Sequence, residues 1–257
     1  MKIVDIEAAK KEFIKYVDKY DLTNEGIERK KNHSLRVMEI SNELAKEEQF
    51  SEEKIEIATL IGLLHDLARF KQYTEYQTLS DQQSFDHGNM AIKILEEKDY
   101  LRKFIQTEKY DEIIKKAIKN HNKPVIEEGL RCEQEKFCKL IRDADKIDIL
   151  YLATKELWEN EKKLMEKSKL NNNLKKEFDR EKSIQYSNYK QIRYADQIIL
   201  FLSYIYDLNY KVSFEIIKKN NYIEKIKNRF EFKDEYTKKE ILKAIEETQE
   251  YILKKLE

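Results

Sequence analysis

Apolar side chains recur at helical spacing along most of the chain. His33, Val37, Ile40 and Leu44 fall at i, i+4, i+7 and i+11, which places them on one face of a helix. We expect this helix to cover residues 28–48, approximately, and to turn His33 toward the core.

The most apolar stretch follows Ser51, a residue type that often caps helix N-termini. Glu52 and Glu53 come next, where the helix dipole favours acidic side chains. Apolar residues then occupy most positions to about residue 69, so this predicted helix has almost no polar face. We therefore expect it to be central in the fold, with His65 and Asp66 inside it.

Gly62 lies within this predicted helix, one turn before Asp66. Glycine inside a helix costs about 1 kcal/mol relative to alanine. Either the close approach of a neighbouring helix or simple packing would explain its presence.

Other segments with helical periodicity surround the central one. A polar loop over residues 74–86 precedes a helix that Asp86 is expected to cap. A charged, Asn-rich arm at about 160–190 has the weakest periodicity; we expect it to be mobile and solvated, or alternatively to form a substrate lid. C-terminal helices are expected over residues 191–257. The other predicted helices cover about 5–20, 87–97, 110–120, 133–159 and 237–256, the last capped at Thr237.

Composition favours an all-α fold class. The 257 residues include only 4 Gly and 1 Pro, and tight turns between strands depend on such residues. An all-β sandwich or barrel is therefore excluded, and the helical spacing of the hydrophobic 40% argues against disorder. No Gly-, Ser- or Pro-rich linker divides the chain, so we expect a single domain over residues 1–257.

Charge and the remaining composition restrict the expected partners. Lys+Arg and Asp+Glu number 50 each, so the net charge is +0 and nucleic-acid binding is not expected. The N-terminal stretch is too acidic for a signal peptide, and no segment nears the roughly 20 apolar residues that span a bilayer. We expect a cytoplasmic protein with no membrane partner, and self-association is left open. Cys132 and Cys138 lack C-x-x-C spacing and are expected to be ordinary thiols.

The chain has four histidines, and two of them, His33 and His65, occur among apolar residues. Burying such groups is costly unless they form hydrogen bonds or bind a metal. His65 and Asp66 are adjacent on the predicted central helix, about 100° apart, so both can reach one point beside it. Asp145 lies in another apolar stretch, with Asp143 as the rival carboxylate.

Imidazole and carboxylate together favour transition-metal ions. Two divalent ions about 3.5–4 Å apart, sharing one carboxylate, would use all the candidates. We expect iron or manganese, with zinc, cobalt, nickel or magnesium as alternatives. His87 and His121 could instead be helix-end residues that bind no metal. The candidate ligands are His33, His65, Asp66, His87, His121 and Asp145.

The order of these residues resembles that of a known family. The pattern H…HD…H…H…D appears with the local sequences HSLRV, GLLHDLARF, DHG, NHN and RDADKID. It is similar to the HD-domain superfamily of metal-dependent phosphohydrolases, with an HD core at about 28–155. The resemblance implies an HD-domain helical bundle, to which the C-terminal helices would be additional.

The resemblance also implies roles for individual residues. His87 and His121 would hold a second metal, joined to the first through a bridging Asp66. This arrangement resembles the binuclear branch, which includes cyclic-nucleotide phosphodiesterases and a bacterial dinucleoside tetraphosphate hydrolase. Arg69 stands where many binuclear members carry lysine, and the lack of a GYP motif argues against the cyclic-di-GMP branch. The first metal would be bound by His33, His65, Asp66 and Asp145.

The implied function is hydrolysis of a phosphoester or phosphoanhydride bond in a small nucleotide-type substrate. The two metals would generate a bridging hydroxide that attacks phosphorus in line with the leaving group. Asp66 would be the central catalytic residue, while Arg69 and Lys123 would neutralise charge on the phosphoryl oxygens. Two alternatives are a nucleotide-sensing or partner-binding protein without turnover, and a nuclease acting on polynucleotides.

Overall fold

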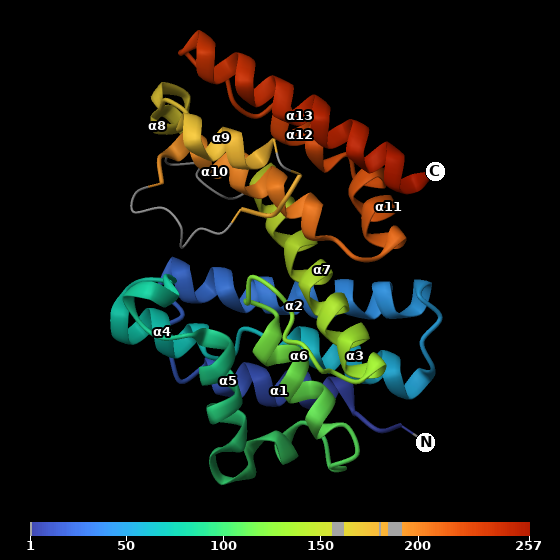
Figure 1. Ribbon diagram of the computed structural model, residues 1–257. Helices are drawn as coiled ribbons and strands as arrows, with labels where there is room; N and C mark the ends of the chain where they lie inside the picture. The colour runs from blue at the N-terminus through green and yellow to red at the C-terminus, as the bar shows by residue number, and fades with distance from the viewer. Residues whose placement is uncertain (1, 156–161, 180, 185–191) are drawn as a thin grey trace. The chain divides into compact units, whose positions relative to one another are not determined.

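The computed structural model describes residues 2–155, 162–179, 181–184 and 192–257. Over these residues the chain forms helices, turns and loops without a strand, which confirms the all-α fold class (Figure 1). Contacts between Cα atoms divide the chain into two compact units, Met1–Asp145 and Lys146–Glu257. The boundary lies inside one helix, α7 (Cys132–Lys155), so no linker marks it in the sequence. The single domain expected over residues 1–257 stays a prediction.

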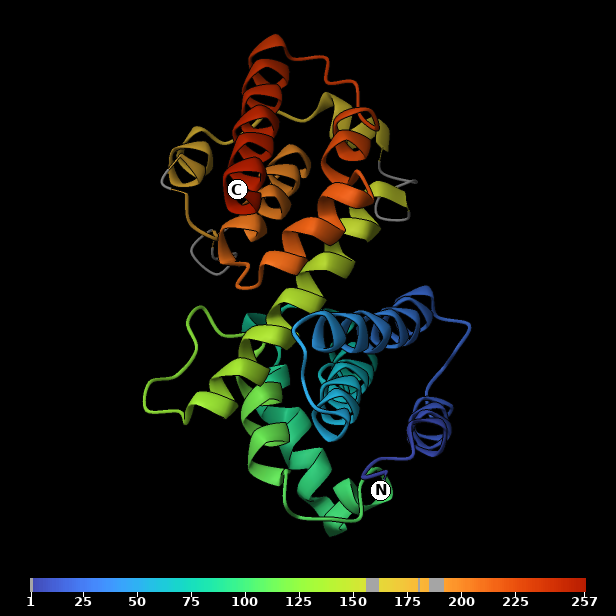
Figure 2. The same cartoon turned by 90° about the vertical axis from the view of Figure 1, so that its right-hand side faces the viewer.

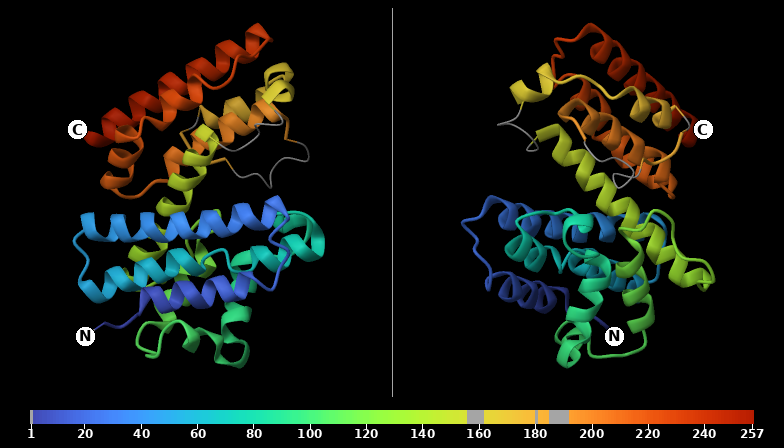
Figure 3. Two further views of the ribbon diagram at one scale, coloured as in Figure 1. Left: turned by 180° about the vertical axis from the view of Figure 1, so that it is seen from behind. Right: turned by 60° about the vertical axis from the view of Figure 1, so that its left-hand side comes forward.

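The first unit is organised around α3 (Glu52–Leu64). α2 (Glu25–Glu47) packs along it, and α1 (Ile6–Val17) and α6 (Asp111–Asn120) also contact it. Figure 3 shows α2, α3 and α1 stacked in successive layers. Each residue from Ile57 to Leu64 is buried, so α3 occupies the centre of the unit. The unit also contains α4 (Arg69–Tyr76), η1 (Asp81–Gln83), α5 (His87–Glu96) and η2 (Glu97–Lys103).

α2 and α3 approach each other closely at Gly62. A Cβ atom at this position would lie 2.6 Å from Ser41 Oγ, 2.8 Å from the Val37 carbonyl oxygen and 2.9 Å from Met38 Cα. A side chain here would therefore push the two helices apart. The close approach of a neighbouring helix explains why glycine is present despite its low helix propensity.

The central helix ends earlier than the sequence predicts. α3 stops at Leu64, and residues 65–68 form a turn before α4 begins at Arg69. His65 Nδ1 lies 2.8 Å from the Gly62 carbonyl oxygen, and the backbone hydrogen bonds tighten to i→i−3 at Leu67 and Arg69. His65 and Asp66 therefore lie at the end of α3 and not within a continuous helix. In addition, α4 and η1 occupy part of the expected polar loop.

Two predicted helix caps had different outcomes. Asp86 caps α5 as expected, because its Oδ1 accepts a hydrogen bond of 2.8 Å from the Asn89 N–H. The prediction that Thr237 caps α13 (Glu235–Leu256) is wrong. Asp234 is the cap, and its Oδ2 accepts hydrogen bonds from both the backbone N–H and the hydroxyl of Thr237.

In the second unit, α10 (Tyr194–Ser203) and α11 (Lys211–Lys219) pack against α13, which Figure 2 draws in red. α12 (Tyr222–Lys227) contacts both α11 and α13, and η5 (Tyr204–Asp207) follows α10. α8 (Lys162–Lys167) and α9 (Asn172–Phe178) contact α10. Among all the described helices, none combines the length and the apolar character needed to cross a bilayer.

The segment at 160–190 is folded where the structure describes it. α8 and α9 lie within it, and Met165, Leu170, Leu174 and Phe178 are buried. The expectation of a solvated arm is therefore wrong for these residues. Leu170, Leu174 and Phe178 follow one another at intervals of four, but the many intervening Lys and Asn residues hide this apolar face in the composition. Residues 160–161, 180 and 185–190 lie outside the described residues.

Replacing Gly62 by alanine should destabilise the first unit by about 1–3 kcal/mol, because the added methyl group overpacks the α2–α3 contact. The free energy of unfolding measured in urea tests this expectation. Adding Ser41→Ala should restore only part of the loss, since the Val37 carbonyl and Met38 Cα would still be too close. An unchanged unfolding midpoint for Gly62→Ala would contradict the close-contact explanation.

Candidate metal centre

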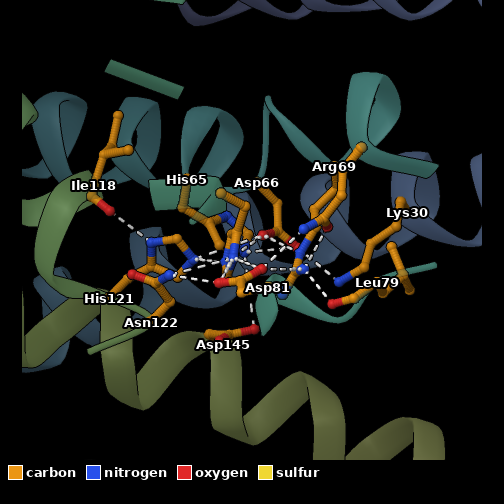
Figure 4. Close-up of polar contacts among 12 residues, drawn as sticks. Lys30, His65, Asp66, Arg69, Leu79, Asp81, Ile118, His121, Asn122 and Asp145 are labelled. Carbon is orange, nitrogen blue, oxygen red and sulfur yellow. Dashed lines mark hydrogen bonds and ion pairs between the residues drawn. The ribbon is translucent and has the colours of Figure 1, made fainter. Parts of the chain in front are cut away.

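Four histidines and one aspartate of the first unit converge on one region. Figure 4 shows His65, Asp66 and His121 among them. His33 lies within α2 and His87 opens α5, while His65 and His121 come directly after the last residues of α3 and α6. Asp66 follows in the turn after α3. All five residues are buried, with exposed fractions between 0% and 4%. Separate elements of the fold therefore place imidazole and carboxylate groups together, away from water.

Asp66 is shared by two clusters of metal-ligand type. We define site A as His33, His65 and Asp66, and site B as Asp66, His87 and His121. Asp66 Oδ2 faces site A, 3.4 Å from His33 Nε2 and 3.7 Å from His65 Nε2. Asp66 Oδ1 faces site B, 3.3 Å from His87 Nε2 and 3.6 Å from His121 Nε2. Each carboxylate oxygen of Asp66 thus faces one pair of imidazoles.

Asp145 extends site A from α7. Its Oδ1 lies 3.1 Å from His33 Nε2 and 3.8 Å from His65 Nε2. Burial opposes ionisation of Asp145, but its contacts with His33 and His65 hold its pKa well below the usual range. These contacts place the Asp145 carboxylate beside both imidazoles of site A. The choice of Asp145 over Asp143 as the ligand stays a prediction.

Hydrogen bonds at Nδ1 orient three of the imidazoles. His65 Nδ1 donates to the Gly62 carbonyl oxygen at 2.8 Å, and His121 Nδ1 donates to the Ile118 carbonyl oxygen at 2.6 Å. His87 Nδ1 donates to the carboxylate of Asp81, 2.6 Å from Oδ2. Carbonyl and carboxylate oxygens can only accept, so the proton of each neutral ring is on Nδ1. The Nε2 lone pairs therefore face Asp66.

The donor set fits divalent metal ions. Burial lowers the pKa of His65, and burial together with the charge of Arg69 lowers the pKa of His87 to about 3. The Nε2 atoms of His87 and His121 are 2.9 Å apart, and those of His33 and His65 are 3.2 Å apart. Lone pairs this close repel each other unless a cation lies beside them. Two nitrogens at right angles around an ion about 2.1 Å away would be about 3 Å apart.

The charge of Asp66 is retained inside the protein. Burial opposes its ionisation, but Lys30, His65 and Arg69 hold its pKa well below the usual range. Lys30 Nζ lies 2.7 Å from Asp66 Oδ2, and Arg69 Nε lies 3.4 Å from Asp66 Oδ1. Neutral imidazoles and ionised carboxylates together suit iron, manganese or zinc better than calcium, which prefers oxygen ligands alone.

Gly88 allows the two histidines of site B to approach each other. A Cβ atom on Gly88 would lie 2.7 Å from Asn122 Oδ1 and 3.1 Å from the Ile118 carbonyl oxygen. The start of α5 therefore packs directly on the end of α6, where His121 is located. Gly62 does the same for α2 and α3, so each histidine pair depends on one close contact between helices.

Comparison with protein families identifies this part of the chain. The family model of the HD domain matches residues 31–150, a range that contains every predicted metal ligand. The chain contains an HD domain. This domain is typical of metal-dependent phosphohydrolases, and its buried His and Asp groups here are compatible with divalent metal binding. Comparisons with curated proteins and with solved structures gave no significant match.

Two residues at the HD-domain site were not found from the sequence. Lys30 precedes His33 by three positions and so lies on the same face of α2, a spacing that could have revealed it. Asp81 lies on η1, between α4 and α5, where no periodic pattern signals which side chains face inward. Only the tertiary structure shows that its carboxylate meets His87.

The two expected phosphate-binding cations are both engaged. Arg69 Nη1 donates to Gln72 Oε1, to the Leu79 carbonyl oxygen and to Asp81 Oδ1. Lys123 Nζ forms an ion pair with the Asp86 carboxylate at the start of α5. Arg69 therefore borders the HD-domain site with one of its nitrogens already bonded, whereas the Lys123 ammonium pairs with a carboxylate outside sites A and B.

Replacing both His87 and His121 by alanine should lower the metal content from about two ions per chain to about one, because site B loses its nitrogen ligands while site A keeps its own. Elemental analysis of anaerobically purified protein measures this directly. One ion in both proteins would show that His87 and His121 do not hold a metal.

Acid should destabilise the metal-free protein partly through His87. The folded pKa of about 3 lies below the unfolded value of roughly 6.5, so only the unfolded chain takes up this proton between those values. The contribution of His87 to the free energy of unfolding is fully present above about pH 6.5. It falls as the pH drops toward 3, by up to about 1.4 kcal/mol per pH unit for one proton. Urea unfolding in the presence of a chelator measures the free energy of unfolding at each pH from 4 to 6. This free energy should change less steeply with pH for His87→Gln than for the wild type. Equal slopes for both proteins would contradict this account.

Proposed function

We propose that this protein is a metal-dependent phosphohydrolase that uses two divalent ions to cleave a phosphoester or phosphoanhydride bond of a nucleotide-type substrate. The observation that carries the proposal is the geometry of Asp66, whose two carboxylate oxygens each face one pair of imidazoles. A ligand for a single ion would not need a second histidine pair. The HD domain supports the same class of chemistry.

The proposed ions are iron or manganese, with zinc, cobalt, nickel or magnesium as alternatives. When bound, they would activate water and polarise a phosphoryl oxygen. Site A would hold one ion with the help of Asp145, and site B would hold the other. Asp66 would couple the geometries of the two sites, because a movement of its carboxylate changes the ligand positions of both at once.

Lys30 and Arg69 are the proposed phosphate-binding groups. Their side chains are 17% and 14% exposed, whereas the imidazoles are almost fully buried. A substrate phosphate would therefore approach beside these two cations, and Lys30 can turn its ammonium group from Asp66 toward it. Lys123 is a weaker candidate than expected from the sequence, because its charge is balanced by Asp86. Arg69 would mainly orient the substrate phosphate, since its Nη1 already donates hydrogen bonds within the protein.

Purified protein loaded anaerobically with manganese should hydrolyse at least one of a set of nucleoside phosphates, cyclic nucleotides and dinucleoside polyphosphates. Asp66→Ala should lower kcat/KM by more than about 100-fold, because even groups behind a metal ligand contribute about 10–100-fold. Phosphate release and chromatography of the nucleotide products are the measurements. An Asp66→Ala variant with unchanged metal content and activity would disprove the assignment, and ligand binding without turnover would favour a sensor.

Lys30→Gln provides a sharper test of the same site, with Lys31→Gln as its matched control. Loss of a charge-assisted hydrogen bond should lower kcat/KM about 10–100-fold for Lys30→Gln. Lys31 is the next residue on α2, and its replacement should change kcat/KM by less than about 2-fold. Equal losses of kcat/KM in both variants would indicate that the overall positive charge of α2 matters, and not a specific contact of Lys30 with phosphate.

A further inference from the structure

The carboxylate of Asp81 lies directly behind site B, on the far side of the His87 ring from Asp66. His87 Nδ1 is 2.6 Å from Asp81 Oδ2 and 2.8 Å from Oδ1. Asn122 Nδ2 donates to Oδ2 at 2.9 Å, and Arg69 Nη1 donates to Oδ1 at 3.0 Å. The Asp81 carboxylate thus contacts His87 of site B directly. It also contacts Asn122, which follows His121 in the sequence, and Arg69.

The two sites differ in the negative charge that they offer an ion. Site A has Asp145 in addition to the shared Asp66. Within the part of the chain that the structure describes, the candidate ligands of site B are the shared Asp66 and two imidazoles. Asp86, near Asn122, is paired with Lys123. The carboxylate that contacts a histidine of site B from behind is Asp81.

The loop that carries Asp81 is also held by hydrogen bonds that do not involve the Asp81 carboxylate. Gln72 Nε2 donates to Ser84 Oγ at 2.8 Å and to the Phe85 carbonyl oxygen at 3.1 Å. Ser84 Oγ in turn donates to the Ser80 carbonyl oxygen at 2.8 Å. The same Gln72 Nε2 also donates to Asp81 Oδ1 at 2.9 Å, so fully buried Gln72 holds this segment at Ser84 and Phe85 as well as at Asp81. The hydrogen bonds at Ser84 and Phe85 do not depend on the charge of Asp81, so they remain when that charge is removed.

We propose that Asp81 is a positioning residue that controls metal occupancy of site B. It holds the His87 proton on Nδ1, which leaves the Nε2 lone pair facing site B, and it supplies negative charge behind a site that has few carboxylates. Carboxylates behind metal-bound histidines act in this way in metalloenzymes. Through Arg69, which also contacts Asp66 Oδ1 at 3.4 Å, Asp81 is connected to the bridging ligand. The proposal rests on the two-ion function proposed above.

Titration of the metal-free full-length chain with Mn²⁺ tests this assignment. Calorimetry of the wild type should show two binding events per chain. Asp81→Asn should lower the Mn²⁺ affinity of one binding event about 10–100-fold and change the affinity of the other by less than about 3-fold. Electron paramagnetic resonance should show the loss of the exchange-coupled signal of a manganese pair and the retention of a single-ion signal.

Three further variants identify which site is affected. In a chain carrying His87→Ala and His121→Ala, adding Asp81→Asn should leave the affinity of the remaining site A unchanged. Ser84→Ala removes a loop hydrogen bond without touching His87, and it should keep both binding events. Asp81→Glu keeps the charge and should retain site B within about 10-fold of the wild type; it serves as the test if Asp81→Asn does not fold.

Several outcomes would overturn the proposal. Unchanged binding in Asp81→Asn, equal weakening of both events, or the same loss in Ser84→Ala would each exclude a specific role at site B. Loss of site B in a folded Asp81→Glu variant as complete as in Asp81→Asn would exclude charge as the cause. If the wild type binds only one ion, the two-ion function fails and this proposal fails with it, whereas two ions in the wild type with no effect of Asp81 would overturn the positioning role alone.

Discussion

The burial of the Asp66 carboxylate is the constraint around which the first unit is arranged. An isolated carboxylate among apolar helices would be strongly unfavourable, so it requires partners with positive or partial positive charge. Lys30 from α2 and Arg69 from α4 supply that charge, and both Asp66 oxygens remain directed at imidazoles. Removing these partners would leave a charge inside the core, which is why α2, α3 and α4 must meet at this point.

Two helix termini orient imidazoles of the site. His65 and His121 each follow the last residue of a helix and donate from Nδ1 to a carbonyl oxygen three residues earlier. Carbonyl groups in the last turn of a helix lack partners within the helix, so these imidazoles satisfy groups that would otherwise need water. The same hydrogen bond fixes the ring and leaves Nε2 free. One hydrogen bond thus both caps the helix and orients the imidazole, and this occurs at His65 and again at His121.

Electrostatics make the two halves of the site unequal. Asp145 and Asp66 both contact His33 in site A, whereas His87 in site B contacts Asp66 on one side and Asp81 on the other. Arg69 lies between the two carboxylates Asp66 and Asp81, so its guanidinium group stabilises both. Its position between them makes it part of the support for the ligands as well as a candidate contact for phosphate.

The sequence by itself determined the helical class and the central position of α3, because helical periodicity reports which faces are buried. The histidines and aspartates that converge were expected from the HD-domain pattern in the sequence, and not from periodicity alone. The sequence did not determine where α3 ends, that Lys30 and Asp81 join the site, or that the described parts of 160–190 pack as helices. Asp81 meets His87 across a turn without periodicity, and α7 continues through the boundary between the units. Local spacing specifies which side of a helix turns inward, but the partner of a buried charge depends on which other segment reaches it, and only the tertiary structure decides that.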